Sequence, residues 1–172
     1  MDAPSRTTNA KRIYRARPTD AEIAEVLAMR LAAAVGTLNE DGSIHLAYVI
    51  FLHEDGRLYF ETSSVTRKAR NAQDRGRATM LIQGQASTGT HLMVAAEGDA
   101  TVIAGSRAHE INERLRAKYI RPEALGEINQ AWGPLDDLAV EIVPRAWRSW
   151  TSGPFHEHTQ QTLTSEYDDA WI

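Results

Sequence analysis

The chain has 172 residues, of which 42% are hydrophobic and 24% are charged, and this composition is typical of one globular domain with a single core. Its net charge of -4 argues against nucleic-acid binding by phosphate neutralisation, and its lack of cysteine excludes disulfides, thiolate catalysis and cysteine-ligated metals. No segment is apolar enough for a signal peptide or a membrane span, so we expect a cytoplasmic protein with no nucleic-acid or membrane partner.

The first part of the chain is polar and is predicted to form a mobile N-terminal arm over residues 1–18. Thr19 and Glu22 then form a capping box, and apolar residues recur at helical spacing, which predicts a short helix over residues 20–29. We expect this helix to close one end of the core.

Three strands are predicted next, joined by turns that contain Asp-Gly. A small apolar segment at 31–38 is followed by a turn at 39–42 and by β-branched and aromatic residues at 43–52, which predicts a hairpin. A second turn at 53–56 leads to a strand at 57–61, so the three strands form an antiparallel meander.

The segment after the third strand brings hydroxyl groups, backbone amides and two cations to one reversal of the chain, where a helix over residues 66–74 begins. The residues concerned are Thr62, Ser63, Ser64, Arg67 and Lys68. Two cations at a helix N-terminus oppose the helix dipole, and an anion bound there resolves the conflict. The pattern makes this turn a candidate phosphate site. Its alternative is an N-cap, a turn and a solvated helix face.

The rest of the chain returns to strands. A fourth strand is predicted over residues 77–83 and a fifth over 91–103, where Gly98 indicates a bulge or bend. A sixth strand is predicted over 137–150, and Pro144 requires an edge position or a bulge there because it has no backbone N–H.

Two further helices, over residues 106–118 and 122–131, separate the fifth strand from the sixth, and a polar C-terminal tail over 151–172 follows. Six strands in mainly antiparallel order with short helices between them predict a mainly β fold with α insertions, a closed or partly closed barrel over residues 19–150. A doubly wound fold does not fit, because long helices and a glycine-rich first turn are missing.

The order of elements, with the segments FETSSVTRKARN and RATMLI, resembles the FMN-binding split-barrel superfamily typified by pyridoxamine 5'-phosphate oxidase. The resemblance extends over most of the chain. It implies a six-stranded antiparallel split β-barrel in a homodimer, with two flavins in grooves between the subunits. The phosphate ligands that it implies are Thr62, Arg67 and Lys68, with Ser63 and Ser64 as candidates.

The same resemblance implies how the flavin ring is held. The second strand would lie along the isoalloxazine and offer backbone groups from Tyr48, Val49, Ile50 and Phe51. Trp150 matches an aromatic residue that lies beside the flavin in the family, although an ordinary strand aromatic is the alternative.

Several positions depart from the oxidase itself. The oxidase has an arginine and a lysine at the ends of the second-strand motif, where this chain has Ala47 and Leu52, and a family glutamine corresponds to Met93. The ending that grips pyridoxal phosphate in the family is absent. We therefore expect no genuine pyridoxamine 5'-phosphate oxidase, and the remaining pattern looks more like the flavin/deazaflavin oxidoreductase branch, whose members use FMN, FAD, haem or the deazaflavin coenzyme.

The first hypothesis is an FMN-dependent oxidoreductase that transfers a hydride between the flavin and a small organic substrate. A deazaflavin-dependent reductase on the same fold is the second, and a flavin or haem carrier without turnover is the third; FAD and haem rank below FMN, and a purely structural barrel ranks last. Catalytic residues stay unassigned, because no acid/base pair can be named. No metal site is expected, since the histidines lack ligand spacing and the cluster His156, Glu157 and His158 is typical of a solvated tail.

Overall fold

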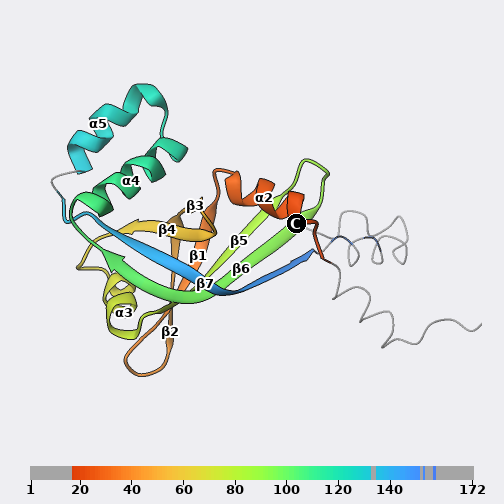
Figure 1. Ribbon diagram of the computed structural model, residues 1–172, viewed down its shortest axis with the longest axis horizontal. Helices are drawn as coiled ribbons and strands as arrows, with labels where there is room; N and C mark the ends of the chain where they lie inside the picture. The colour runs from red at the N-terminus through yellow and green to blue at the C-terminus, as the bar shows by residue number, and fades with distance from the viewer. Residues whose placement is uncertain (1–16, 133–134, 152, 154–156, 158–172) are drawn as a thin grey trace, which may run out of the picture.

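Seven strands form one curled antiparallel sheet, a half-barrel with the helices outside it, in the computed structural model (Figure 1). The structure describes residues 17–132, 135–151, 153 and 157. The expected mainly β fold with α insertions is confirmed. Most of the predicted arm and most of the predicted tail lie outside the described residues, and so do His156 and His158.

The sheet has the strand order β2-β1-β5-β6-β7-β4-β3, and every neighbouring pair is antiparallel. The elements in chain order are α2 (Asp20–Ala28), β1 (Ala32–Leu38), β2 (Ile44–Ile50), β3 (Leu52–Glu54), β4 (Arg57–Thr62), α3 (Arg67–Arg75), β5 (Arg77–Gln85), β6 (His91–Ile103), α4 (Ser106–Tyr119), α5 (Pro122–Trp132) and β7 (Leu138–Thr151). No described helix is long and apolar enough to cross a bilayer.

Helix α2 begins at the predicted capping box. The backbone N–H of Thr19 donates to Glu22 Oε2 over 2.8 Å, and the Thr19 hydroxyl accepts from the Glu22 N–H over 3.3 Å. The helix buries Val26 against β5, where Gly84 leaves room for it: a Cβ at Gly84 would lie 2.9 Å from a Val26 methyl. The glycine therefore lets α2 close this end of the core.

The predicted count of six strands is wrong, because the expected strand at 43–52 is interrupted at Phe51. The Phe51 carbonyl accepts from the Tyr119 hydroxyl over 3.0 Å and from Lys118 Nζ over 3.4 Å, so side chains of α4 replace a neighbouring strand there. After this break the chain passes from β2, at one edge of the sheet, to β3, at the other. The two edges are thus joined by one residue, which gives the sheet its barrel-like closure.

The long β6–β7 ladder shifts its register between Glu97 and Gly98. A Cβ at Gly98 would lie 2.2 Å from the Val143 carbonyl oxygen, and Pro144 stands opposite Gly98 without a backbone N–H. The predicted bulge is confirmed, and it allows β7 to occupy the middle of the sheet despite its proline.

The main core fills the concave side of the sheet. Its fully buried large side chains include Val35, Phe51, Leu58, Phe60, Met80, Ile82, Leu92 and Ile142. A smaller cluster lies between α4 and the β3, β4 and β7 strands, and consists of Leu52, Tyr59, Ile103, Ala108, Ile111, Leu115 and Ala139. The second cluster attaches α4 to the outside of the sheet, next to the end of β4 at which the candidate site begins.

Candidate functional site

The turn between β4 and α3 presents hydroxyl groups at the start of the helix. Thr66 is the N-cap, and its hydroxyl accepts from the Ala69 N–H over 3.3 Å. The hydroxyl oxygens of Thr62 and Thr66 lie 2.7 Å apart. Arg67 and Lys68 occupy the first helical turn, as the sequence predicts, so the positive end of the helix dipole and two cations lie at this turn.

Ser63 and Ser64 already bind an anion, the carboxylate of Asp136. The Ser64 N–H donates to Asp136 Oδ2 over 2.8 Å, the Ser63 hydroxyl donates to the same oxygen over 3.1 Å, and the Ser64 hydroxyl donates to it as well. These hydrogen bonds, above all those from Ser64, lower the pKa of Asp136. The donor set of this turn therefore suits a carboxylate or a phosphate oxygen.

A pocket of about 400 Å³ lies beside this turn, between β2, β4 and the first turn of α3. We call it the β2–α3 pocket. Its lining residues are Tyr48, Val49, Ile50, Glu61, Thr62, Ser63, Lys68, Trp132, Leu135, Asp136 and Asp137. Six residues singled out from the sequence thus meet in one place, and they come from three separate elements. The burial of Lys68 lowers its pKa, so its ammonium group lies in a partly desolvated environment.

The other singled-out residues lie elsewhere. Ser64 lies next to the pocket through its bonds to Asp136. The backbone N–H and carbonyl of Phe51 contact the Tyr119 hydroxyl, and the Phe51 side chain is fully buried in the core. Trp150 pairs with Met93 near the far end of β7. At a rise of ~3.3 Å per residue it lies about 40 Å along the strand from Leu138, the residue that pairs with Thr62.

Arg67 lines a different cavity from Lys68, because successive residues of a helix point in different directions. We call this cavity, of about 820 Å³, the Arg67 groove. It lies between α3 and the β1–β2 turn, and its lining residues are Asn39, Glu40, Asp41, Ser43, Arg67, Arg70, Asn71, Asp74 and Arg75. The two cations of the first turn therefore face two separate cavities.

A buried ion network supports the wall of the β2–α3 pocket. Arg116, which has no exposed side-chain surface, donates from Nε to Glu61 over 3.1 Å and from Nη2 to Asp137 over 2.9 Å. Its guanidinium carbon lies 5.3 Å from the Trp132 ring centroid. Burial is the largest influence on Glu61 and raises its pKa, although Arg116 opposes the rise.

Sequence reasoning missed Arg116, Asp136 and Asp137. One signal was available: Ala108, Asn112 and Arg116 recur at a spacing of four on α4, which places the arginine on a buried stripe that requires an acidic partner. The identity of that partner had no local signal, because Glu61 lies 55 residues earlier in the chain.

The backbone edge of β2 is also available at the pocket. Among the described strands β2 pairs only with β1, so the peptide groups on its other side have no strand partner. Tyr48, Val49 and Ile50 lie on this edge where it borders the pocket. Unpaired peptide groups in a row can bind a flat ring that carries its own donors and acceptors along one side.

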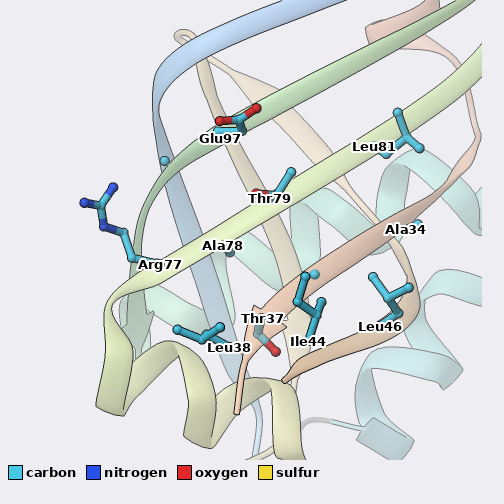
Figure 2. A pocket seen from close by; sticks show the side chains of 12 residues that line it. Ala34, Thr37, Leu38, Ile44, Leu46, Arg77, Ala78, Thr79, Leu81 and Glu97 are labelled. Atoms are coloured by element: carbon cyan, nitrogen blue, oxygen red, sulfur yellow. The ribbon is translucent and has the colours of Figure 1, made fainter. Parts of the chain in front are cut away.

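The outer face of the sheet is unusually apolar. Side chains at alternate positions of β2 point outward, and those of Ile44, Leu46 and Tyr48 are 69%, 68% and 82% exposed. With Leu38 and Leu81 they form what we call the outer apolar face, and a groove of about 550 Å³ crosses it (Figure 2). Tyr48 also lines the β2–α3 pocket, so the face and the pocket are continuous.

No group of three or more histidine, aspartate or glutamate side chains that could hold a metal ion occurs among the residues that the structure describes. The chemistry of the β2–α3 pocket suits a ligand that carries an anionic group and a flat ring. The turn binds a carboxylate already, and the edge of β2 offers free peptide groups beside it. The pocket volume lies within the range of about 300–1,000 Å³ that is usual for small-molecule sites.

A family model described as pyridoxamine 5'-phosphate oxidase matches residues 19–151. Among solved structures, a conserved hypothetical protein from Mycobacterium tuberculosis is 24% identical, with a TM-score of 0.67 over 81% of this chain and 88% of that one. An FAD-binding protein from Mesorhizobium loti is 13% identical, with a TM-score of 0.55 over 77% and 94% of the two chains. An F420 reductase is 17% identical, with a TM-score of 0.56 over 76% and 98%. No curated protein matches the chain.

The likeness to solved structures shows the fold alone, because all three identities are low. The family match is of a different kind, since it extends from the capping box of α2 to the end of β7 and includes every strand of the sheet. The chain therefore belongs to the pyridoxamine 5'-phosphate oxidase family, within the split-barrel superfamily that the sequence resembles.

Proposed function

We propose that this chain is a flavin-dependent oxidoreductase that binds FMN in the β2–α3 pocket and transfers a hydride between the flavin and a small organic substrate. One observation supports the proposal most. The anion-binding turn at the end of β4 and the unpaired edge of β2 meet in one pocket of about 400 Å³. The turn suits the phosphate, and the strand edge suits the ring.

Different residues of the pocket would bind different parts of the flavin. Lys68 supplies a positive charge to the phosphate, and Thr62 and Ser63 supply hydroxyl donors. The peptide groups of Tyr48 to Ile50 orient the ring, while Trp132 adds apolar surface that excludes water. A bound flavin supplies the hydride chemistry, and the chain supplies position and electrostatics.

A deazaflavin-dependent reductase is the second candidate. The Arg67 groove supports it, because this groove lies on the other side of the first turn of α3 and contains three arginines, Arg67, Arg70 and Arg75, beside the carboxylates of Glu40, Asp41 and Asp74. A coenzyme longer than FMN could place its phosphate near Lys68 and extend an acidic tail into these arginines. The likeness to an F420 reductase agrees with this candidate at the level of the fold.

A homodimer formed through the outer apolar face is part of the proposal. Exposed apolar patches can mark protein–protein contact sites, and a second copy of the chain would cover the exposed side chains of Ile44, Leu46 and Tyr48. Because Tyr48 belongs both to the face and to the pocket, such a dimer would place each flavin site at the subunit boundary. Trp150, which the fold holds far from the pocket of its own chain, could then contribute to the pocket of its partner.

Oxidation of pyridoxamine 5'-phosphate is not proposed. Ala47 and Leu52 stand where the oxidase has an arginine and a lysine, and this departure argues against that substrate.

Titration of the purified protein with FMN, riboflavin and the deazaflavin coenzyme, followed by flavin fluorescence, tests the proposal. We expect saturable FMN binding that is tighter than riboflavin binding, and a rise in the melting temperature with FMN concentration. Reduction of the bound flavin by NAD(P)H, or its reoxidation by a substrate, separates an enzyme from a carrier. Absence of binding by FMN would exclude the first candidate, and tighter binding of the deazaflavin coenzyme would establish the second.

A further inference from the structure

We propose that Asp136 is a specificity-determining residue of the β2–α3 pocket, because its carboxylate competes with an incoming phosphate for the donors of Ser63 and Ser64. The inference rests on the proposed function, since it concerns the same anion site. The competition weakens the binding of a phosphorylated flavin and leaves the binding of an unphosphorylated one unchanged. The preference of the pocket for the phosphorylated form is therefore smaller than it would be without Asp136. The competition also implies that the phosphorylated cofactor exchanges readily.

The geometry shows direct competition for donors. Three donors converge on one oxygen of Asp136, namely the N–H of Ser64 and the hydroxyls of Ser63 and Ser64. Charge-assisted hydrogen bonds of this kind would also hold a phosphate oxygen. Each of these donors has a single hydrogen, so a phosphate can use them fully only after the carboxylate has moved away.

The register of the sheet brings Asp136 to this place. In the β4–β7 ladder Glu61 pairs with Ala139 and Thr62 pairs with Leu138. When the same antiparallel register is continued past this end of the ladder, two residues beyond Thr62 and two residues before Leu138, Ser64 stands opposite Asp136. The carboxylate is therefore held next to the turn by neighbouring strand pairs, and its effective concentration at the turn is high.

The charge around the pocket strengthens the effect. Three carboxylates line it, those of Glu61, Asp136 and Asp137, whereas Lys68 is the cation on its wall. Arg116 adds one buried positive charge, which Glu61 and Asp137 share. One negative charge is left over, and a phosphate monoester brings a further charge of about −1.5 to −2 at neutral pH. Neutralising Asp136 removes this excess.

The test compares Asp136→Asn with the wild-type protein in titrations with FMN and with riboflavin. Asparagine keeps an acceptor for Ser64 but has no charge, so the turn stays ordered while the competition weakens. We expect FMN to bind about tenfold more tightly, the equivalent of about one charge-assisted hydrogen bond, and riboflavin to bind as before. Asp136→Ala, which removes both carboxylate oxygens, should shift FMN affinity in the same direction.

Asp55→Asn is the matched control, because it removes one exposed carboxylate from the β3–β4 turn, and asparagine tolerates the positive φ of 50° there. It should leave both affinities unchanged. Equal FMN affinity in the wild type and Asp136→Asn, or weaker binding in the variant, would overturn this inference and leave the proposed function standing. Binding of neither flavin by any of these proteins would overturn both.

Discussion

The hydroxyl oxygen of Tyr119 lies 3.0 Å from the carbonyl oxygen of Phe51 and 3.3 Å from its amide nitrogen. Both backbone groups of the residue between β2 and β3 thus contact one side chain of α4. We expect Tyr119→Phe to lower the free energy of unfolding by about 1–3 kcal/mol, because the Phe51 N–H loses its acceptor in a buried place. Urea denaturation measures this change. Tyr48→Phe, at an exposed tyrosine, should have little effect, and equal losses in the two variants would contradict the argument.

Lys118 should make the stability of the protein depend on pH above neutrality. Burial lowers its pKa from 10.5 in the free side chain to about 8 in the folded protein. Between these values the unfolded chain binds more protons than the folded one, so the free energy of unfolding contributed by Lys118 rises as pH rises. Lys118→Met should remove this contribution. The difference in unfolding free energy between wild type and variant, measured at about pH 7.5 and about pH 9.5, should shift in favour of the wild type at the higher pH.

His53 interacts electrostatically with Lys118: the pKa of His53 is lowered by its own burial and, to a smaller extent, by the positive charge of the lysine. His53 is neutral throughout this pH window and does not alter the sign. If the difference in unfolding free energy between the wild type and Lys118→Met stays constant with pH, the prediction for Lys118 is contradicted.

Arg116 and Arg114 lie on the same helix, but we expect their replacement to cost different amounts of stability. Replacement of the fully buried Arg116 by Met leaves the carboxylates of Glu61 and Asp137 without their cation, which should cost about 3–5 kcal/mol of stability. Arg114→Met breaks an exposed ion pair with Glu54, which should cost less than about 1 kcal/mol. Chemical denaturation of both variants provides the comparison, and similar losses would show that the buried network is not the cause.

Lys68→Ala should weaken FMN binding by about tenfold, since one charge-assisted contact to the phosphate is lost. Riboflavin binding should be unchanged, because riboflavin has no phosphate. The control is Arg121→Ala, which removes a positive charge from an exposed position at the start of α5. Fluorescence titration measures all three proteins. Equal weakening of FMN and riboflavin would mean that Lys68 supports the shape of the pocket and does not bind phosphate.

Leu46→Glu should convert the proposed dimer into a monomer, because it places a charge in the centre of the outer apolar face. Val65→Glu is the control, since Val65 is equally apolar, is 78% exposed and lies outside that face. Sedimentation analysis of the three proteins gives their masses. A wild-type monomer, or a Leu46→Glu dimer, would show that the face has another role.

Local signals in the sequence predicted the elements of the fold well. The capping box at Thr19 and the bulge near Gly98 each depend on neighbouring residues or on the backbone chemistry of one residue. The break at Phe51 could not be predicted in this way. It depends on a tyrosine 68 residues later in the chain, and an uninterrupted run of β-branched and aromatic residues gave no sign of it.

In the candidate site, too, residues close together in the sequence could be predicted and distant ones could not. Thr62, Ser63 and Lys68 are near one another in sequence, so their common location could be predicted from a single strand-turn-helix segment. Asp136, which binds the same turn, is 72 residues from Ser64 and is brought there by the strand register. The sequence did not predict that Arg67 and Lys68 line separate cavities, because this depends on where α3 packs in the folded chain.

The position of β7 has a consequence for how the protein is made. This strand pairs with β6 on one side and with β4 on the other, yet it is the last of the described strands in chain order. Before β7 leaves the ribosome, the nascent chain can form a four-stranded sheet and a β3–β4 hairpin, but no strand pairing links the two. The half-barrel, and with it the contact between Ser64 and Asp136, can be completed only after synthesis has passed this strand, so incomplete chains expose two pairs of unprotected sheet edges.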